Sequence, residues 1–233
     1  MYSSDPRLRV KHCGKSACAR TGREHLRRMK DVIKPDGELT FRRALRFPVQ
    51  SPEARREILI GGLLLLIPAW GWIANLGHRV VYTHNMLNGR DPFPAWKSYG
   101  EITRHGLITL AGMVYYHLPG ALALAAGWYF DLAALNVVGS VLWLLGTLLV
   151  PGYMTRYCRN YDARLIWNVR ETVRTVVRGG AAYWKAWAVV AAAMALSFLG
   201  LLALGIGFLF TSVWFWQTAA FSFASVFARE AST

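Results

Sequence analysis

The stretch AWAVVAAAMALSFLGLLALGIGFLFTSVWFWQTAAFSFASVFA, residues 186–228, decides the fold class of this chain. These 43 residues contain no Asp, Glu, Lys, Arg or His. A single helix of that length would extend about 65 Å, whereas the hydrocarbon core of a bilayer is only about 30 Å thick. The stretch therefore predicts two membrane-spanning helices, which separate at Gly205-Ile206-Gly207.

The rest of the chain has the same character. Of the 233 residues, 54% are hydrophobic and 17% are charged, whereas soluble domains are about 45–50% apolar and about 25% charged. The pattern predicts an all-α, polytopic membrane helix bundle. A basic flexible arm, residues 1–38, precedes a membrane domain, residues 39–230, and a short tail, residues 231–233. The five expected apolar segments cover about 58–77, 106–128, 132–155, 185–204 and 207–228.

The net charges of the segments between the apolar runs predict the membrane topology. Residues 1–57 carry a net charge of +8, residues 77–105 carry +2 and residues 156–185 carry +5. Five full crossings would place the +5 segment outside, against the tendency of Lys and Arg to stay on the cytoplasmic side. We therefore favour four full spans and a first segment bent at Pro68 into a re-entrant or shallow hairpin, with five full crossings as the alternative. Both termini are then cytoplasmic, in a prokaryotic cytoplasmic (inner) membrane.

Local signals predict where several helices begin and end. Ser51 followed by Pro52 is typical of a helix start, and Asn88-Gly89 is typical of a helix end. Two connections, 78–88 and 157–178, have apolar residues at helical spacing and predict amphipathic helices in the headgroup plane.

The net charge of +14 favours anionic lipid headgroups as a partner over nucleic acid, because the cations gather beside the apolar segments. No metal site is expected, since Cys13 and Cys18 lack further ligands nearby. A lipid or partner surface is expected at basic and aromatic residues of the arm, the second connection and the last span. These are Arg27, Arg28, Lys30, Arg170, Arg174, Arg178, Trp214 and Trp216.

Residues 40–120 carry an ordered set of features. They are Arg46-Phe47-Pro48, the run Gly61-Gly62-Leu63-Leu64-Leu65-Leu66-Ile67-Pro68, then Gly77, Arg79, Asn85, Gly89, Arg90, Pro92, Pro94, Trp96, Gly106 and Pro119. In this order they resemble Domain of Unknown Function 4013, a family of polytopic membrane proteins. The resemblance extends through Gly152-Tyr153 to about residue 228, with departures at His78 and Lys97. It implies a membrane location and a helical fold but no activity.

His117 is, tyrosines aside, the only ionisable residue well inside a predicted span. Ionisable groups at that depth are functional candidates, and an imidazole there is able to ligate haem or a chlorophyll-type pigment. The alternative is a neutral histidine bonded to a neighbouring helix beside Pro119.

No phosphate-binding glycine loop, nucleophile elbow or paired-histidine zinc motif occurs in the sequence. We therefore expect a non-catalytic membrane protein, an accessory or structural subunit that docks onto a larger membrane complex or organises the surrounding bilayer. The alternative is a small-molecule or lipid transporter or channel-like protein. A weaker alternative is a haem- or chlorophyll-binding subunit that uses His117.

Overall fold

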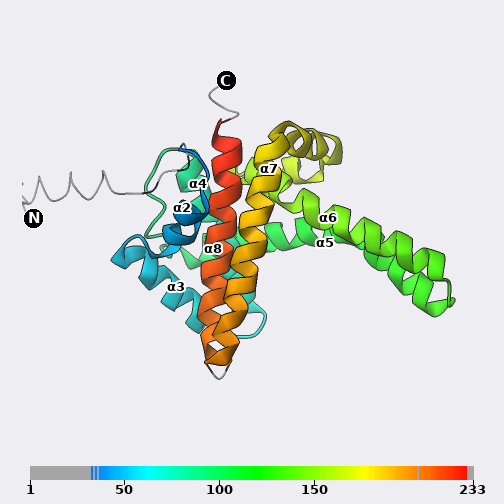
Figure 1. Cartoon of the computed structure of the whole chain (residues 1–233), viewed down its shortest axis with the longest axis horizontal. Helices are drawn as coiled ribbons and strands as arrows, with labels where there is room; N and C mark the ends of the chain where they lie inside the picture. Colours follow the sequence, from blue (N-terminus) through cyan, green and yellow to red (C-terminus); the bar gives the residue numbers. More distant parts are fainter. Residues whose placement is uncertain (1–32, 34, 36, 204, 230–233) are drawn as a thin grey trace, which may run out of the picture. The chain divides into compact units, whose positions relative to one another are not determined.

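The computed structural model describes residues 33, 35, 37–203 and 205–229. This part of the chain forms α-helices joined by turns and three short 3₁₀ helices, and it contains no strand (Figure 1). The α-helices are α2 (Phe41–Arg46), α3 (Pro52–Leu64), α4 (Trp70–Leu87), α5 (Tyr99–Tyr129), α6 (Ala133–Asn160), α7 (Val169–Ser197) and α8 (Ile206–Arg229). The 3₁₀ helices are η2 (Phe47–Val49), η3 (Ala163–Trp167) and η4 (Phe198–Leu202).

Three of the helices are long and apolar enough to cross a membrane: α5, α6 and α7 extended by η4. They include three of the four predicted full spans. The fourth predicted span forms α8. Its hydroxyl and amide side chains make α8 less apolar than the other three helices, so it is not among those identified as long and apolar enough to cross. Helix α8 lies alongside α7 and also contacts α2, α3, α4 and α6 (Figure 1).

The first apolar run is divided near Pro68, as its sequence predicts. Helix α3 begins at the expected cap, where the Ser51 hydroxyl accepts a hydrogen bond from Ala54 N at 3.1 Å. It ends at Leu64, and α4 begins at Trp70 after Ala69 adopts a positive φ of 60°. The Asn75 amide of α4 then donates to the Gly61 carbonyl of α3 at 3.1 Å, so the two helices fold back on each other.

The segment 78–88 differs from its prediction. It is not a separate interfacial helix, because residues 78–87 form the second half of α4. Its predicted end is confirmed, since α4 stops at Leu87 and Gly89 takes a positive φ of 68°. Most of this half is buried by α5, α6 and α8, as Val80 and Tyr82 show.

The second connection, 157–178, is also not one helix. Residues 157–160 complete α6, and Tyr161 turns the chain with a φ of 57°. The Asn168 side chain caps the next helix by accepting from Glu171 N at 3.0 Å. Only the part from Val169 onward forms the expected amphipathic helix, and it is joined to the span by a break at Gly180, where φ is 48°.

Buried polar groups attach α3 and α4 to the loop before α5. Glu57 and His78 are each 2% exposed and hydrogen-bonded to each other. Ala95 N donates to Glu57 Oε1 at 3.1 Å. The His78 ring stacks on Trp96 with centroids 4.0 Å apart. The pair fixes the register of α4 against α3.

Helices α4 and α5 cross with their backbones in contact at Gly77 and Gly106. A Cβ on Gly77 would overlap the Ile102 carbonyl of α5, and one on Gly106 would overlap the Ile73 carbonyl of α4. Small residues allow this approach, which larger side chains would prevent.

We predict that Gly106→Ala lowers the free energy of unfolding by about 1–3 kcal/mol, because the added methyl group forces α4 and α5 apart. Gly100→Ala is the matched control in the same helix, since a Cβ there meets no atom within 4 Å. It should be neutral or stabilising by up to about 1 kcal/mol. Unfolding titrations in mixed detergent micelles measure both, and equal effects would contradict the crossing.

Candidate functional site

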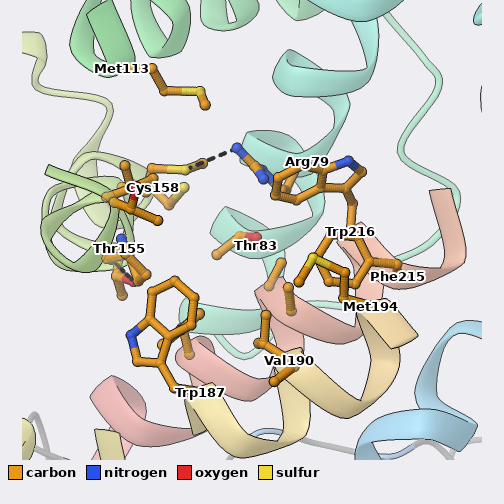
Figure 2. Close-up of a pocket in the computed structure, with 18 of the residues that line it drawn as sticks. Arg79, Thr83, Met113, Thr155, Cys158, Trp187, Val190, Met194, Phe215 and Trp216 are labelled. Atoms are coloured by element: carbon orange, nitrogen blue, oxygen red, sulfur yellow. Dashed lines mark hydrogen bonds between the residues drawn. The ribbon is translucent and has the colours of Figure 1, made fainter. Parts of the chain in front are cut away.

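A cavity of about 570 Å³ lies between α4, α5, α6, α7 and α8. Its walls are almost entirely apolar, formed by residues such as Val150, Met154, Val190, Phe215 and Ala219. The polar side chains around it are few, and Arg79 is the only one that carries a fixed charge. Helix α4 contributes Arg79 and Thr83, one turn apart on the same face (Figure 2).

Arg79 is buried, with 6% of its surface exposed. Its guanidinium carbon lies 4.5 Å from the centre of the Trp216 ring, and Nη2 approaches the Met154 sulfur at 3.1 Å (Figure 2). Its Nε has no hydrogen-bond partner. In the described part of the chain no carboxylate forms an ion pair with it.

The magnitudes show that Arg79 is not compensated by its surroundings. Burying an ion costs several kcal/mol even after the protein relaxes. A desolvated cation–π contact contributes about 2 kcal/mol, and a thioether sulfur is a weak acceptor. Arginine keeps its proton in proteins, so the cost cannot be avoided by neutralisation. The guanidinium therefore keeps most of the cost of its burial.

One further polar group in the cavity wall lacks a partner. The Thr83 hydroxyl is buried without a hydrogen bond, whereas the Trp187 indole interacts with Tyr183. Buried polar atoms are nearly always paired, so two unpaired groups on one helix face beside a cavity are unusual. Figure 2 shows Thr83 near Arg79, with Trp187 on the wall formed by α7. The unpaired polar atoms of α4, Arg79 Nε and the Thr83 hydroxyl, thus belong to one side of the cavity.

The polar residues of α8 do not contribute to this site. Thr218, Ser222 and Ser225 donate to carbonyls one turn earlier in their own helix, at 2.8–3.0 Å. Such bonds satisfy a hydroxyl within its own helix. The α8 residues that line the cavity are instead aromatic residues and alanines.

His117 lies on the cavity wall and is half-buried. Its Nδ1 is 2.8 Å from the Met113 carbonyl, and its Nε2 is 3.0 Å from the Thr147 hydroxyl of α6. Ligation of a haem or pigment metal through either nitrogen would require that bond to break. The arrangement is that of a histidine bonded to a neighbouring helix.

The other histidines of the described chain have separate hydrogen-bond partners. His84 and His105 both stack on Tyr161, but their hydrogen-bonding atoms differ: His84 approaches the Cys158 carbonyl at 2.7 Å, and His105 approaches the Tyr157 hydroxyl at 2.6 Å. No group of three or more His, Cys, Asp or Glu residues able to hold a metal occurs within this part of the chain.

The residues predicted to form a lipid or partner surface have different surroundings. Arg170, Arg174 and Arg178 are exposed on the first part of α7. Trp214 donates to the Leu45 carbonyl at 3.3 Å, and Trp216 lies under Arg79 with 42% of its surface exposed. Arg27, Arg28 and Lys30 lie outside the described residues.

Sequence reasoning did not single out Arg79 as a site residue. It lay in a segment predicted to be interfacial, where an arginine needs no explanation. The available signal was its isolation in the sequence, because Arg79 is the only charged residue between Glu57 and Arg90. A lone charge in so long an uncharged stretch indicates either a hydrated turn or a buried site.

These features define an all-helical protein with long apolar helices and an apolar cavity that buries one unpaired arginine. The chain belongs to the family described as protein of unknown function (DUF4013), whose profile matches residues 60–210. Nothing among the curated proteins or the solved structures matches the chain significantly.

We predict that Arg79→Met stabilises the protein after its lipids have been stripped, by about 1 kcal/mol or more, because the substitution removes an unpaired buried charge. Met retains the length and apolar stem of the side chain. Arg79→Lys keeps the charge and should give no such gain. Unfolding of the lipid-stripped protein measures both, and a less stable Arg79→Met variant would contradict this account.

Proposed function

We propose that this protein binds a lipid-soluble molecule with an anionic head group in the cavity around Arg79, as a membrane carrier or transporter for that class of ligand. The observation that carries the proposal is the unpaired, buried guanidinium in an otherwise apolar cavity. An anion supplies the missing charge, and an apolar tail occupies the rest of the space. The cavity volume of about 570 Å³ lies within the range of about 300–1,000 Å³ for small-molecule sites.

Access from the bilayer supports a lipid-soluble ligand. Ala191 and Met194 of α7 line the cavity and are exposed, with Met194 at 46%. Both lie within the apolar part of α7 that is long enough to cross a membrane. A ligand dissolved in the hydrocarbon would therefore meet the opening without passing through water.

The proposal includes the finer topology expected from the sequence, with α8 as a fourth crossing, the α3–α4 hairpin re-entrant or shallow, and both termini cytoplasmic. The first part of α7 would lie in the headgroup plane. Support comes from two exposed valines of this part, Val173 at 41% and Val177 at 71%. They lie beside the exposed side chains of Arg170, Arg174 and Arg178. Valines exposed in this way are favoured at a lipid interface.

Ligand binding is tested by quenching of tryptophan fluorescence with a brominated fatty acid and with its methyl ester, which lacks the charge. Wild-type protein should bind the acid more tightly than the ester. A charge-assisted hydrogen bond contributes about 1.5–3 kcal/mol, which corresponds to roughly a 10- to 100-fold difference in affinity.

Arg79→Gln should remove most of this preference, because it deletes the charge and leaves the apolar walls. Arg104→Gln is the matched control, since Arg104 is exposed on α5 and does not line the cavity. The proposal fails if the acid and ester bind equally, or if both variants behave alike.

The accessory-subunit function remains a second proposal, supported by the exposed basic and apolar faces of the first part of α7. It predicts that gently solubilised native membranes show the protein in a large complex on native gels. Migration only at the size of the chain or a small oligomer would count against docking and leave the ligand-binding proposal unaffected.

A further inference from the structure

A second cavity, of about 530 Å³, lies between the end of α6, η3, the first part of α7 and the end of α8. Unlike the cavity around Arg79, it has substantial polar surface. Three arginines line it, Arg156 and Arg159 from α6 and Arg178 from α7, together with the Asn160 amide. We refer to these four residues as the basic pocket.

Two of the arginines are held in place by backbone groups. Arg156 Nη1 is 3.4 Å from the Leu165 carbonyl and 3.5 Å from the Thr172 hydroxyl. Arg159 Nη2 donates to the Phe227 carbonyl at 3.0 Å. A guanidinium has five N–H donors, so each retains donors for a ligand. Their attachment reduces the entropy lost when that ligand binds.

Among the residues that the structure describes, no Asp or Glu lines the basic pocket, so its wall does not balance its charge. Arg178 Nη1 lies 4.0 Å from Glu171 Oε1. Glu171 also accepts from Arg174 at 3.2 Å. Asp162 instead accepts from Arg164 N, as the cap of η3. Within residues 37–203 and 205–229, the three arginines therefore share at most part of one carboxylate.

We propose that the basic pocket binds a phosphate group. Arginine matches phosphate because its planar fork donates two parallel hydrogen bonds, and several arginines together neutralise the charge. The phosphate comes either from the head group of a membrane phospholipid or from a soluble phosphate compound. A head group is the expected source if α6 and α8 end at the membrane surface.

This site goes beyond the proposed function, because it does not depend on Arg79. The two cavities adjoin at Thr155, which lines both. Phe223 and Phe227, one turn apart on α8, likewise line the apolar cavity and the polar one respectively.

The test uses the full chain in phosphate-free detergent and in nanodiscs that contain phosphatidylglycerol. Native mass spectrometry counts the phosphatidylglycerol molecules retained after release from the nanodisc. Thermal unfolding in detergent measures stabilisation by inorganic phosphate against chloride at equal ionic strength. Retained lipid identifies a head group as the source, whether or not inorganic phosphate also stabilises the protein, whereas stabilisation by inorganic phosphate without retained lipid identifies a soluble compound.

The double variant Arg156→Gln/Arg159→Gln should reduce binding about tenfold or more, as expected for losing about 1.4 kcal/mol or more. Arg55→Gln/Arg56→Gln is the matched control, because it removes the same charge from exposed positions on α3, outside the pocket. Equal loss in both double variants, or no binding of either probe by the wild type, would overturn the proposal.

Arg156→Lys/Arg159→Lys separates binding from folding, since it keeps the charge but loses the fork geometry. This variant should unfold at the same temperature as the wild type and bind phosphate several-fold more weakly. Unchanged binding would contradict a geometric phosphate site. Arg79→Gln should leave phosphate binding intact, so the two proposals fail independently.

Discussion

The positive charge of Arg79, held in an apolar cavity without a carboxylate, is the constraint on which the functional interpretation depends. Helix α4 cannot rotate to carry this side chain into water. The residue before it, His78, is hydrogen-bonded to Glu57 of α3, and Gly77 is in backbone contact with α5 at Ile102. Two anchors immediately N-terminal to Arg79 thus hold the guanidinium between Trp216 and Met154. The ion must be neutralised where it lies.

The described parts of the surrounding helices do not neutralise this charge. Polar residues of α8 would be the obvious partners, yet Thr218 and Ser222 bond to their own helix backbone. The residues of α8 that line the cavity around Arg79 are aromatic residues and alanines. A cavity of this kind disfavours water, because apolar surfaces give it few hydrogen bonds. An amphiphile satisfies both conditions, since its tail fits the walls and its head meets the cation.

Signals that act within a few residues predicted much of the fold. The Ser51 cap, the Asn88-Gly89 end and the breaks near Pro68 and Gly205 are all present, because each depends on backbone preferences of the residues themselves. The site depends on contacts between distant segments. Met154 and Trp216 reach Arg79 from other helices, and periodicity in 78–88 does not distinguish a face buried by protein from one that rests on lipid.

The two proposed sites should select different anions, because dehydration differs between them. An anion that reaches Arg79 must lose nearly all its water, because the cavity walls are apolar and the Thr83 hydroxyl is the unpaired polar group beside it. Burying charge is costly, and that cost rises with the charge carried, which favours a singly charged carboxylate. The basic pocket has three arginines and an exposed Asn160 at its edge, so a phosphate there keeps part of its hydration. Adjacent sites with opposite demands on hydration suit the two ends of an amphiphile, or two different lipids, better than one polar solute.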